Sequence, residues 1–175
     1  MNRHDEIDKR LTEAGFYSGY IQIVKRWMDE IGYFIAPSSR THHGNYEGGN
    51  CDHSIAVCDQ LVKLTEGLGL SWERQTSPYI VGLFHDLCKC DQYVKNEDTG
   101  EWEYNPNMLC SGHGEKSVMI LSQMMQLTEE EVLCIRYHMG AYVKEDWSGY
   151  DAAIKKYPNV LFTHTADMLA SKLEV

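Results

Sequence analysis

An apolar run over residues 80–84 leads directly into His85 and Asp86, and this junction constrains the fold more than any other part of the chain. A histidine and a carboxylate are costly to bury together unless something pairs with them, and a metal ion is a common partner. A second His-Asp pair, His4 and Asp5, stands in a polar segment, which predicts a solvated helix start. The junction at residue 85 therefore predicts a buried metal site.

The length of 175 residues fits one domain with a single hydrophobic core. We expect one domain over residues 1–175, with N-terminal helices over 1–36 and a motif-bearing core over 41–170. The charged first residues and the lack of a long apolar run predict a cytoplasmic protein without membrane association. Reduced cysteines fit this setting, and Cys88 and Cys90 are interpreted as small buried residues rather than as a structural zinc site.

The formal net charge is −10, and no cluster of lysine or arginine stands out against it. A long nucleic-acid duplex is excluded as a partner, because such binding depends on neutralising phosphates along an extended surface. A small phosphorylated ligand needs only a local positive patch, which a bound metal supplies. The expected partner is therefore a small phosphorylated substrate, and an oligomer remains open.

Apolar residues recur at helical spacing in most segments. The polar, glycine-rich stretch 37–50 predicts a loop, and the aromatic residues around a turn sequence at 91–104 predict a hairpin flap. Thr128 with Glu131 forms a capping-box sequence at a helix start. The chain is therefore predicted to be all-α with one small β-hairpin, and the expected helices are 5–14, 20–31, 52–66, 77–87, 114–125, 128–138, 150–156 and 159–173.

Candidate metal ligands recur along these helices at intervals that each fit one helix and its connection. They are His53, His85 with Asp86, His113, His138 and Asp167. The intervals are 32, 27, 25 and 29 residues, from 53 to 85, 86 to 113, 113 to 138 and 138 to 167. Successive helices of a bundle can present one ligand each to a common centre, so the spacing predicts a shared metal site.

This order of residues resembles the HD-domain superfamily of metal-dependent phosphohydrolases, from about residue 41 to residue 169. The resemblance implies an HD-domain helical bundle in which His53 is the first histidine, His85 and Asp86 are the doublet, and Asp167 is the last aspartate. His113 and His138 correspond to two additional histidines of members that bind two metals. The tract 42–49 is similar to the approach to the first histidine in bacterial HD exoribonucleases, whose nucleic-acid-binding domain has no counterpart here.

Imidazoles with two carboxylates suit iron, manganese, zinc, nickel or cobalt better than magnesium. We expect two divalent transition-metal ions bridged by the oxygens of Asp86. His53, His85 and Asp167 would bind one ion, and His113 and His138 the other. Such a pair activates a shared water, so the expected reaction is attack of a metal-bound hydroxide on a phosphoryl group.

Four further residues are candidates for contact with the substrate. Lys89 is expected to lie on the ligand side of a helix that continues from residue 85, and to act with Asp86 in catalysis; the alternative is a surface lysine. Lys116 follows His113 by three residues and has the same two interpretations. His42 and His43 are either substrate contacts or ordinary exposed loop residues.

Other side chains have a structural interpretation as the first choice. His164, one turn before Asp167, is expected to cap or pack rather than to bind metal. The aromatic residues of the predicted flap, Tyr93, Trp102 and Tyr104, are expected to pack the hairpin onto the bundle, with stacking on a nucleobase as the alternative.

The leading functional hypothesis is a metal-dependent phosphohydrolase that cleaves a phosphomonoester or phosphodiester of a small nucleotide-like substrate. One alternative is a di-iron oxygenase, because relatives with this ligand order include such enzymes. A second alternative is a metal-stabilised module that binds a nucleotide without cleaving it.

Overall fold

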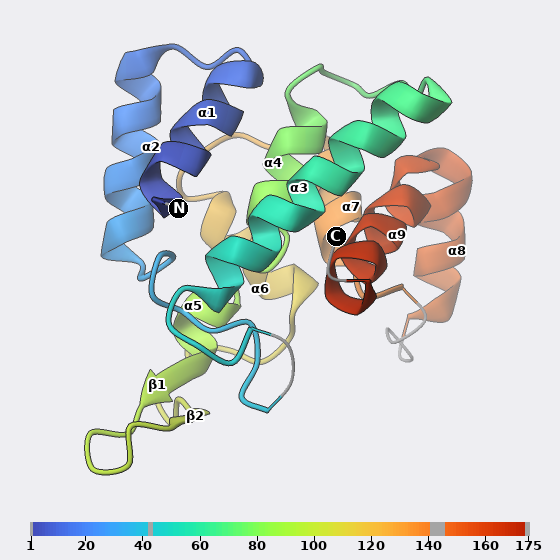
Figure 1. Cartoon of the computed structure of the whole chain (residues 1–175). Coiled ribbons are helices and arrows are strands. Elements are labelled where there is room, and N and C mark those ends of the chain that lie inside the picture. The colour runs from blue at the N-terminus through green and yellow to red at the C-terminus, as the bar shows by residue number, and fades with distance from the viewer. Residues whose placement is uncertain (1, 42–43, 141–145, 174–175) are drawn as a thin grey trace.

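The computed structural model describes residues 2–41, 44–140 and 146–173, and these residues form a mostly helical bundle with one small antiparallel hairpin (Figure 1). The helices are α1 (Arg3–Glu13), α2 (Ser18–Glu30), α3 (Gly49–Leu68), α4 (Ser77–Phe84), α5 (Lys89–Gln92), α6 (Gly114–Leu121), α7 (Glu129–Arg136), α8 (Trp147–Lys156) and α9 (Asn159–Lys172). The strands are β1 (Tyr93–Lys95) and β2 (Trp102–Tyr104).

The centre of the bundle is formed by α3, α4, α7 and α9. Helix α3 packs on α4 and α9, and α7 packs on α4, α6 and α9. Helices α1 and α2 lie on one side of this centre and α8 on the other (Figure 1). One cluster of buried hydrophobic side chains extends from Ile7 of α1 to Ala166 of α9, so the predicted single core is present.

Glycine allows the two central helices to approach closely. A Cβ atom placed on Gly82 of α4 would lie 2.4 Å from the Cα atom of Cys58 on α3. No side chain fits in that space, so the contact requires glycine at this position. This packing brings the C-terminal end of α4 beside the first turns of α3.

Most of the predicted elements are present, and their starts follow the expected local chemistry. Pro78 stands in the first turn of α4, and the Thr128 and Glu131 side chains form a capping box at the start of α7. The prediction of a helix over 77–87 was too long, and the helix does not continue to Lys89. Helix α4 ends at Phe84, residues 85–88 form turns, and the short α5 begins at Lys89.

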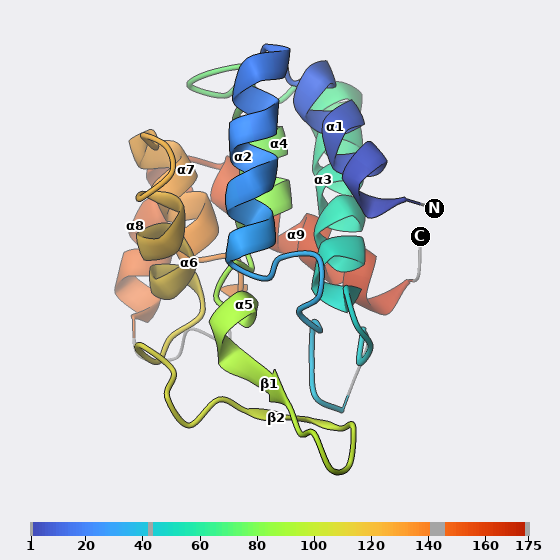
Figure 2. The same cartoon turned by 90° about the vertical axis from the view of Figure 1, so that its left-hand side faces the viewer.

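The hairpin pairs Tyr93 with Tyr104 and Lys95 with Trp102 in antiparallel register. It projects from one end of the bundle, and the connection between α2 and α3 descends to the same end (Figure 2). The C-terminal end of α4 and the N-terminal end of α3 point to this end as well (Figure 1). Within the described residues, no helix is both long enough and apolar enough to cross a membrane.

Candidate metal centre

Side chains from α3, the turn after α4, the end of α7 and α9 meet in one buried cluster. Nε2 of His53 lies 3.1 Å from Oδ1 of Asp167. The ring centroid of His85 is 5.4 Å from that of His53 and 5.0 Å from that of His138. Ligand atoms of His85, His138 and Asp167 lie within 4.8 Å of one another, as do those of His53, His85 and Asp86. Both sets are close enough to share an ion.

Two histidines of this cluster are fixed in the tautomer that a metal requires. Nδ1 of His85 lies 2.9 Å from the carbonyl oxygen of Gly82, and Nδ1 of His138 lies 2.7 Å from that of Ile135. A carbonyl oxygen only accepts hydrogen bonds, so each Nδ1 donates its hydrogen and each Nε2 presents a lone pair. Metal-binding histidines in proteins are commonly oriented in this way.

Among the residues that the structure describes, none forms a hydrogen bond with Nε2 of His85 or Nε2 of His138, and both atoms are buried. An unsatisfied buried polar atom costs about 1 to 3 kcal/mol, so a fold retains one only where something compensates. A cation between the two rings and the neighbouring carboxylates would satisfy both atoms. The donor set therefore fits a metal ion.

A second group of potential ligands lies on the other side of Asp86. Oδ1 of Asp86 is 3.5 Å from Sγ of Cys88, 4.0 Å from Nδ1 of His113 and 3.6 Å from Nε2 of His138. Sγ of Cys88 is 3.4 Å from Nδ1 of His113. Oδ2 of Asp86 instead lies 4.0 Å from Nε2 of His85. The two oxygens of one carboxylate thus face two different sets of ligands.

Helix α6 brings His113 to this group because it begins against the end of α7. A Cβ atom on Gly114 would lie 2.1 Å from the carbonyl oxygen of Arg136, so only glycine permits the contact. His113 immediately precedes Gly114, and His138 follows Arg136 by two residues. The close contact therefore places both histidines beside Asp86.

The charges of His85 and Asp86 suit metal binding at neutral pH, whereas at His138 the effect of burial is outweighed by the carboxylate of Asp86, which raises the pKa. Burial lowers the pKa of His85 to about 4, so its imidazole is neutral. Burial by itself would raise the pKa of Asp86, but the ammonium group of Lys89 opposes this effect, and with the nearby histidines it holds the pKa well below its usual range. Asp86 is therefore ionised. Burial raises the pKa of the Cys88 thiol, which stays protonated while no metal ion is bound.

Comparisons of this chain with protein-family models, with curated proteins and with solved structures found no match. The description of the site therefore rests on the chain's own sequence and geometry.

The structure brings together all six predicted ligands, which are His53, His85, Asp86, His113, His138 and Asp167. Sequence reasoning missed Cys88, which it interpreted as a small buried residue. Cys88 follows Asp86 by two residues, but this spacing indicates a candidate ligand only when the turn at 85–88 is known. That turn directs the sulfur of Cys88 toward His113. His164 donates a hydrogen bond from Nδ1 to the carbonyl oxygen of His138, which is a packing role as predicted.

The predicted substrate residues have different surroundings. Lys89 is close enough to Asp86 to dominate the lowering of its pKa, and its Nζ lies 5.8 Å from the ring centroid of Tyr93. The surroundings of Lys116 do not favour contact with a substrate, because its side chain is 1% exposed and forms an ion pair with Asp91. His42 and His43 lie outside the described residues.

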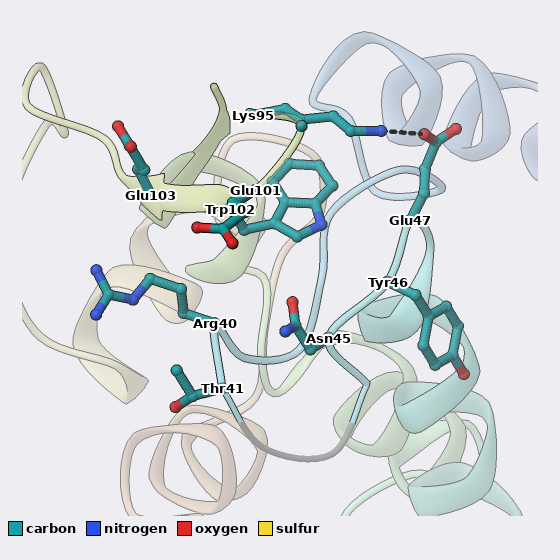
Figure 3. A pocket seen from close by; sticks show the side chains of 10 residues that line it. Arg40, Thr41, Asn45, Tyr46, Glu47, Lys95, Glu101, Trp102 and Glu103 are labelled. Carbon is teal, nitrogen blue, oxygen red and sulfur yellow. Dashed lines mark ion pairs between the residues drawn. The ribbon is translucent and has the colours of Figure 1, made fainter. Parts of the chain in front are cut away.

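A pocket of about 760 Å³ opens between the α2–α3 connection and the hairpin (Figure 3). Trp102, Lys95, Arg40 and Asn45 line it, together with acidic side chains that include Glu47. In Figure 3 the indole of Trp102 lies between Lys95 and Asn45. The pocket lies at the same end of the bundle as the metal centre.

Two tyrosine rings lie between Arg40, which lines the pocket, and Lys89, which follows Asp86. The rings of Tyr93 and Tyr104 are 5.5 Å apart, Lys89 lies by the first ring, and Arg40 lies 5.3 Å from the centroid of the second. Tyr93 is buried, as expected for a residue that packs the hairpin onto the bundle. Trp102 instead lines the pocket.

Proposed function

We propose that this protein is a metal-dependent phosphohydrolase with an HD-type helical bundle, and that it cleaves a phosphoester bond of a small nucleotide-like substrate. The observation that carries the proposal is the position of Asp86. Its two carboxylate oxygens face different ligand sets, with His85 near one oxygen and His113, Cys88 and His138 near the other. This is the arrangement expected of a carboxylate that bridges two ions.

His53, His85, Asp86 and Asp167 would hold one ion, and Asp86 with His113 and His138 would hold the other. His138 lies near both sets, since its Nε2 also groups with His85 and Asp167. A bound pair of such ions lowers the pKa of a coordinated water and neutralises charge on phosphoryl oxygens.

The chain's own residues contribute orientation and charge. The hydrogen bonds to the Gly82 and Ile135 carbonyls keep Nε2 of His85 and His138 directed into the site. The ammonium group of Lys89 adds positive charge beside Asp86 that can bind a phosphoryl oxygen. These features favour a phosphorylated substrate even though the chain as a whole is acidic.

The pocket between the α2–α3 connection and the hairpin favours a nucleotide-like substrate. Trp102 offers a π-face for stacking on a base, and Arg40 and Lys95 supply positive charge at its rim. The carboxylate of Glu47, 3.6 Å from Nζ of Lys95, can accept hydrogen bonds from a sugar or a base. The base would lie in this pocket and the phosphate toward Lys89.

The proposal is tested by phosphate release from nucleotides, cyclic nucleotides and dinucleoside polyphosphates, with the protein loaded separately with Mn²⁺, Co²⁺, Ni²⁺, Fe²⁺ and Zn²⁺. We expect turnover by the wild type and its loss in Asp86→Ala, together with loss of bound metal. The matched control is Asp5→Ala, which alters the exposed His-Asp pair of α1 and should leave both properties unchanged.

Retained turnover in Asp86→Ala would overturn this mechanism. Absence of phosphate release from every substrate, with oxygen consumption by the iron-loaded protein, would overturn the hydrolase assignment in favour of an oxygenase.

A further inference from the structure

The thiol of Cys88 makes two polar contacts, and its single hydrogen can point to only one of the two partners. Its sulfur lies 3.5 Å from Oδ1 of Asp86 and 3.4 Å from Nδ1 of His113. The residue is 1% exposed, so neither contact is made to water. A thiol is a weak donor and a weak acceptor, which makes hydrogen bonding a poor reason to bury sulfur between a carboxylate and an imidazole.

The two sulfur distances are those expected between ligands of one metal ion, and the third pair, Oδ1 of Asp86 and Nδ1 of His113, is slightly wider at 4.0 Å. A tetrahedral ion with a metal–sulfur bond of about 2.3 Å and a metal–nitrogen bond of about 2.0 to 2.1 Å separates the two ligand atoms by roughly 3.5 Å. The two sulfur contacts fall at this separation. Nε2 of His138 lies 3.6 Å from the same oxygen of Asp86 but groups with His85 and Asp167 rather than with Cys88 and His113.

Two hydrogen bonds of Ser117 hold the backbone that carries the sulfur. The backbone N–H of Cys88 donates to Oγ of Ser117 at 3.1 Å, and the backbone N–H of Ser117 donates to the carbonyl oxygen of His113 at 3.0 Å. Ser117 thus connects the turn that carries Cys88 to the helix turn that carries His113. Such support for the ligands is typical of metal sites.

We propose that Cys88 is a sulfur ligand of the second metal position, in a set with Asp86 and His113. This inference rests on the proposed metal centre and adds a soft ligand to it. When the ion binds, the S–H bond breaks, its proton passes to solvent and the thiolate forms the sulfur–metal bond. The second position therefore takes Zn²⁺, Fe²⁺ or Co²⁺ in preference to Mg²⁺ or Mn²⁺.

Titration of the metal-free protein with Co²⁺ tests this assignment without reference to activity. Thiolate bound to Co²⁺ gives a charge-transfer absorption in the near ultraviolet that nitrogen and oxygen ligands do not give. We expect this band in the wild type, its loss in Cys88→Ser, and a fall of at least about tenfold in affinity for the second ion, because loss of an outer-shell partner alone costs that much.

The matched control is Cys90→Ser, two residues further along α5, where the side chain packs against the hydrophobic core. This variant should keep the charge-transfer band and the wild-type affinity for both Co²⁺ ions. His113→Ala provides a second variant at a half-exposed position, and it should lose the second ion while retaining the first. The helical circular dichroism of each variant establishes that it is folded.

Two results would overturn the inference, and only one of them would also overturn the proposed metal centre. If the wild type binds two Co²⁺ ions without the band, and Cys88→Ser binds them equally well, Cys88 is no ligand while the proposed function stands. If the wild type binds no Co²⁺, the proposed metal centre fails together with this inference.

Discussion

Two buried nitrogen atoms are the clearest sign of function at the level of single residues. Nε2 of His85 and Nε2 of His138 have no hydrogen-bond partner, although the other nitrogen of each ring is bonded to a backbone carbonyl. A fold selected for stability alone would replace such rings with apolar side chains. Their presence indicates that the metal-free protein is less stable than its packing allows.

We predict that His85→Leu changes the free energy of unfolding of the metal-free protein by less than about 1 kcal/mol. Removal of the unsatisfied nitrogen stabilises the fold, and loss of the bond to the Gly82 carbonyl destabilises it by a similar amount. The variant should lose most of the stabilisation by metal, which is about 2.7 kcal/mol for the wild type at a concentration of 100 times Kd.

Urea unfolding with and without Zn²⁺ measures both quantities. Leu83→Ala, in the last turn of α4, is the control: it removes a fully buried side chain, should cost about 2 to 5 kcal/mol, and should leave the response to metal intact. A full response to metal in His85→Leu would contradict the assignment of His85 as a ligand.

At the level of elements, Asp91 joins α5, the segment after the hairpin and α6. Its carboxylate forms an ion pair with the buried Lys116 of α6 and accepts hydrogen bonds from the backbone N–H of Leu109 and from Nδ2 of Asn105. These contacts hold the base of the hairpin against the helix that follows His113. The buried ion pair gives Lys116 a structural role in holding α6 against α5.

We predict that Asp91→Asn destabilises the protein by about 2 to 3 kcal/mol, because it leaves the ammonium group of Lys116 buried without a counter-ion. This loss of stability is at or below the lower end of the range for breaking a fully buried ion pair, because the side chain of Asp91 is 32% exposed. Thermal or urea unfolding measures it. Asp91→Asn combined with Lys116→Met should recover most of the loss; no recovery would show that the ion pair is not the cause.

The same pair predicts a pH dependence. Burial by itself would raise the pKa of Asp91, but the hydrogen bond and charge of Lys116, with the hydrogen bonds from Leu109 and Asn105, lower it below the usual value. The stabilisation is therefore complete above the carboxyl's ordinary pKa of about 3.9 and is lost as the pH falls through the lowered pKa. The stability difference between wild type and Asp91→Asn should shrink in acid; a constant difference would contradict this linkage.

The elements show what the sequence could and could not predict. The helices and the hairpin follow from local periodicity, caps and turn residues, which act within a few positions of one another. The break after Phe84 was missed, because an apolar run gives no local signal for the turn that carries His85, Asp86 and Cys88. The partner of Lys116 was missed for a related reason, since Asp91 reaches it only through packing of α5 against α6.

At the level of the whole molecule, the grouping of the six candidate ligands was predictable because they lie on or beside successive helices at regular intervals. The contact between Cys88 and His113 was not, since it depends on Gly114 packing against the end of α7. The formal charge of −10 concerns the entire surface. It does not describe the end that carries Lys89, Arg40 and Lys95, where cationic side chains lie beside the carboxylates of the pocket and where we propose that a small phosphorylated ligand binds.

The central claim is that Asp86 bridges two metal ions inside the bundle. Anomalous diffraction at the metal absorption edge, from crystals of the protein loaded with Zn²⁺ or Co²⁺, tests it most directly. We predict two peaks roughly 3.5 to 4 Å apart, one on each side of the Asp86 carboxylate. Absence of any peak between His53, His85, His113, His138 and Asp167, or a single peak that Asp86 does not contact, would contradict the account.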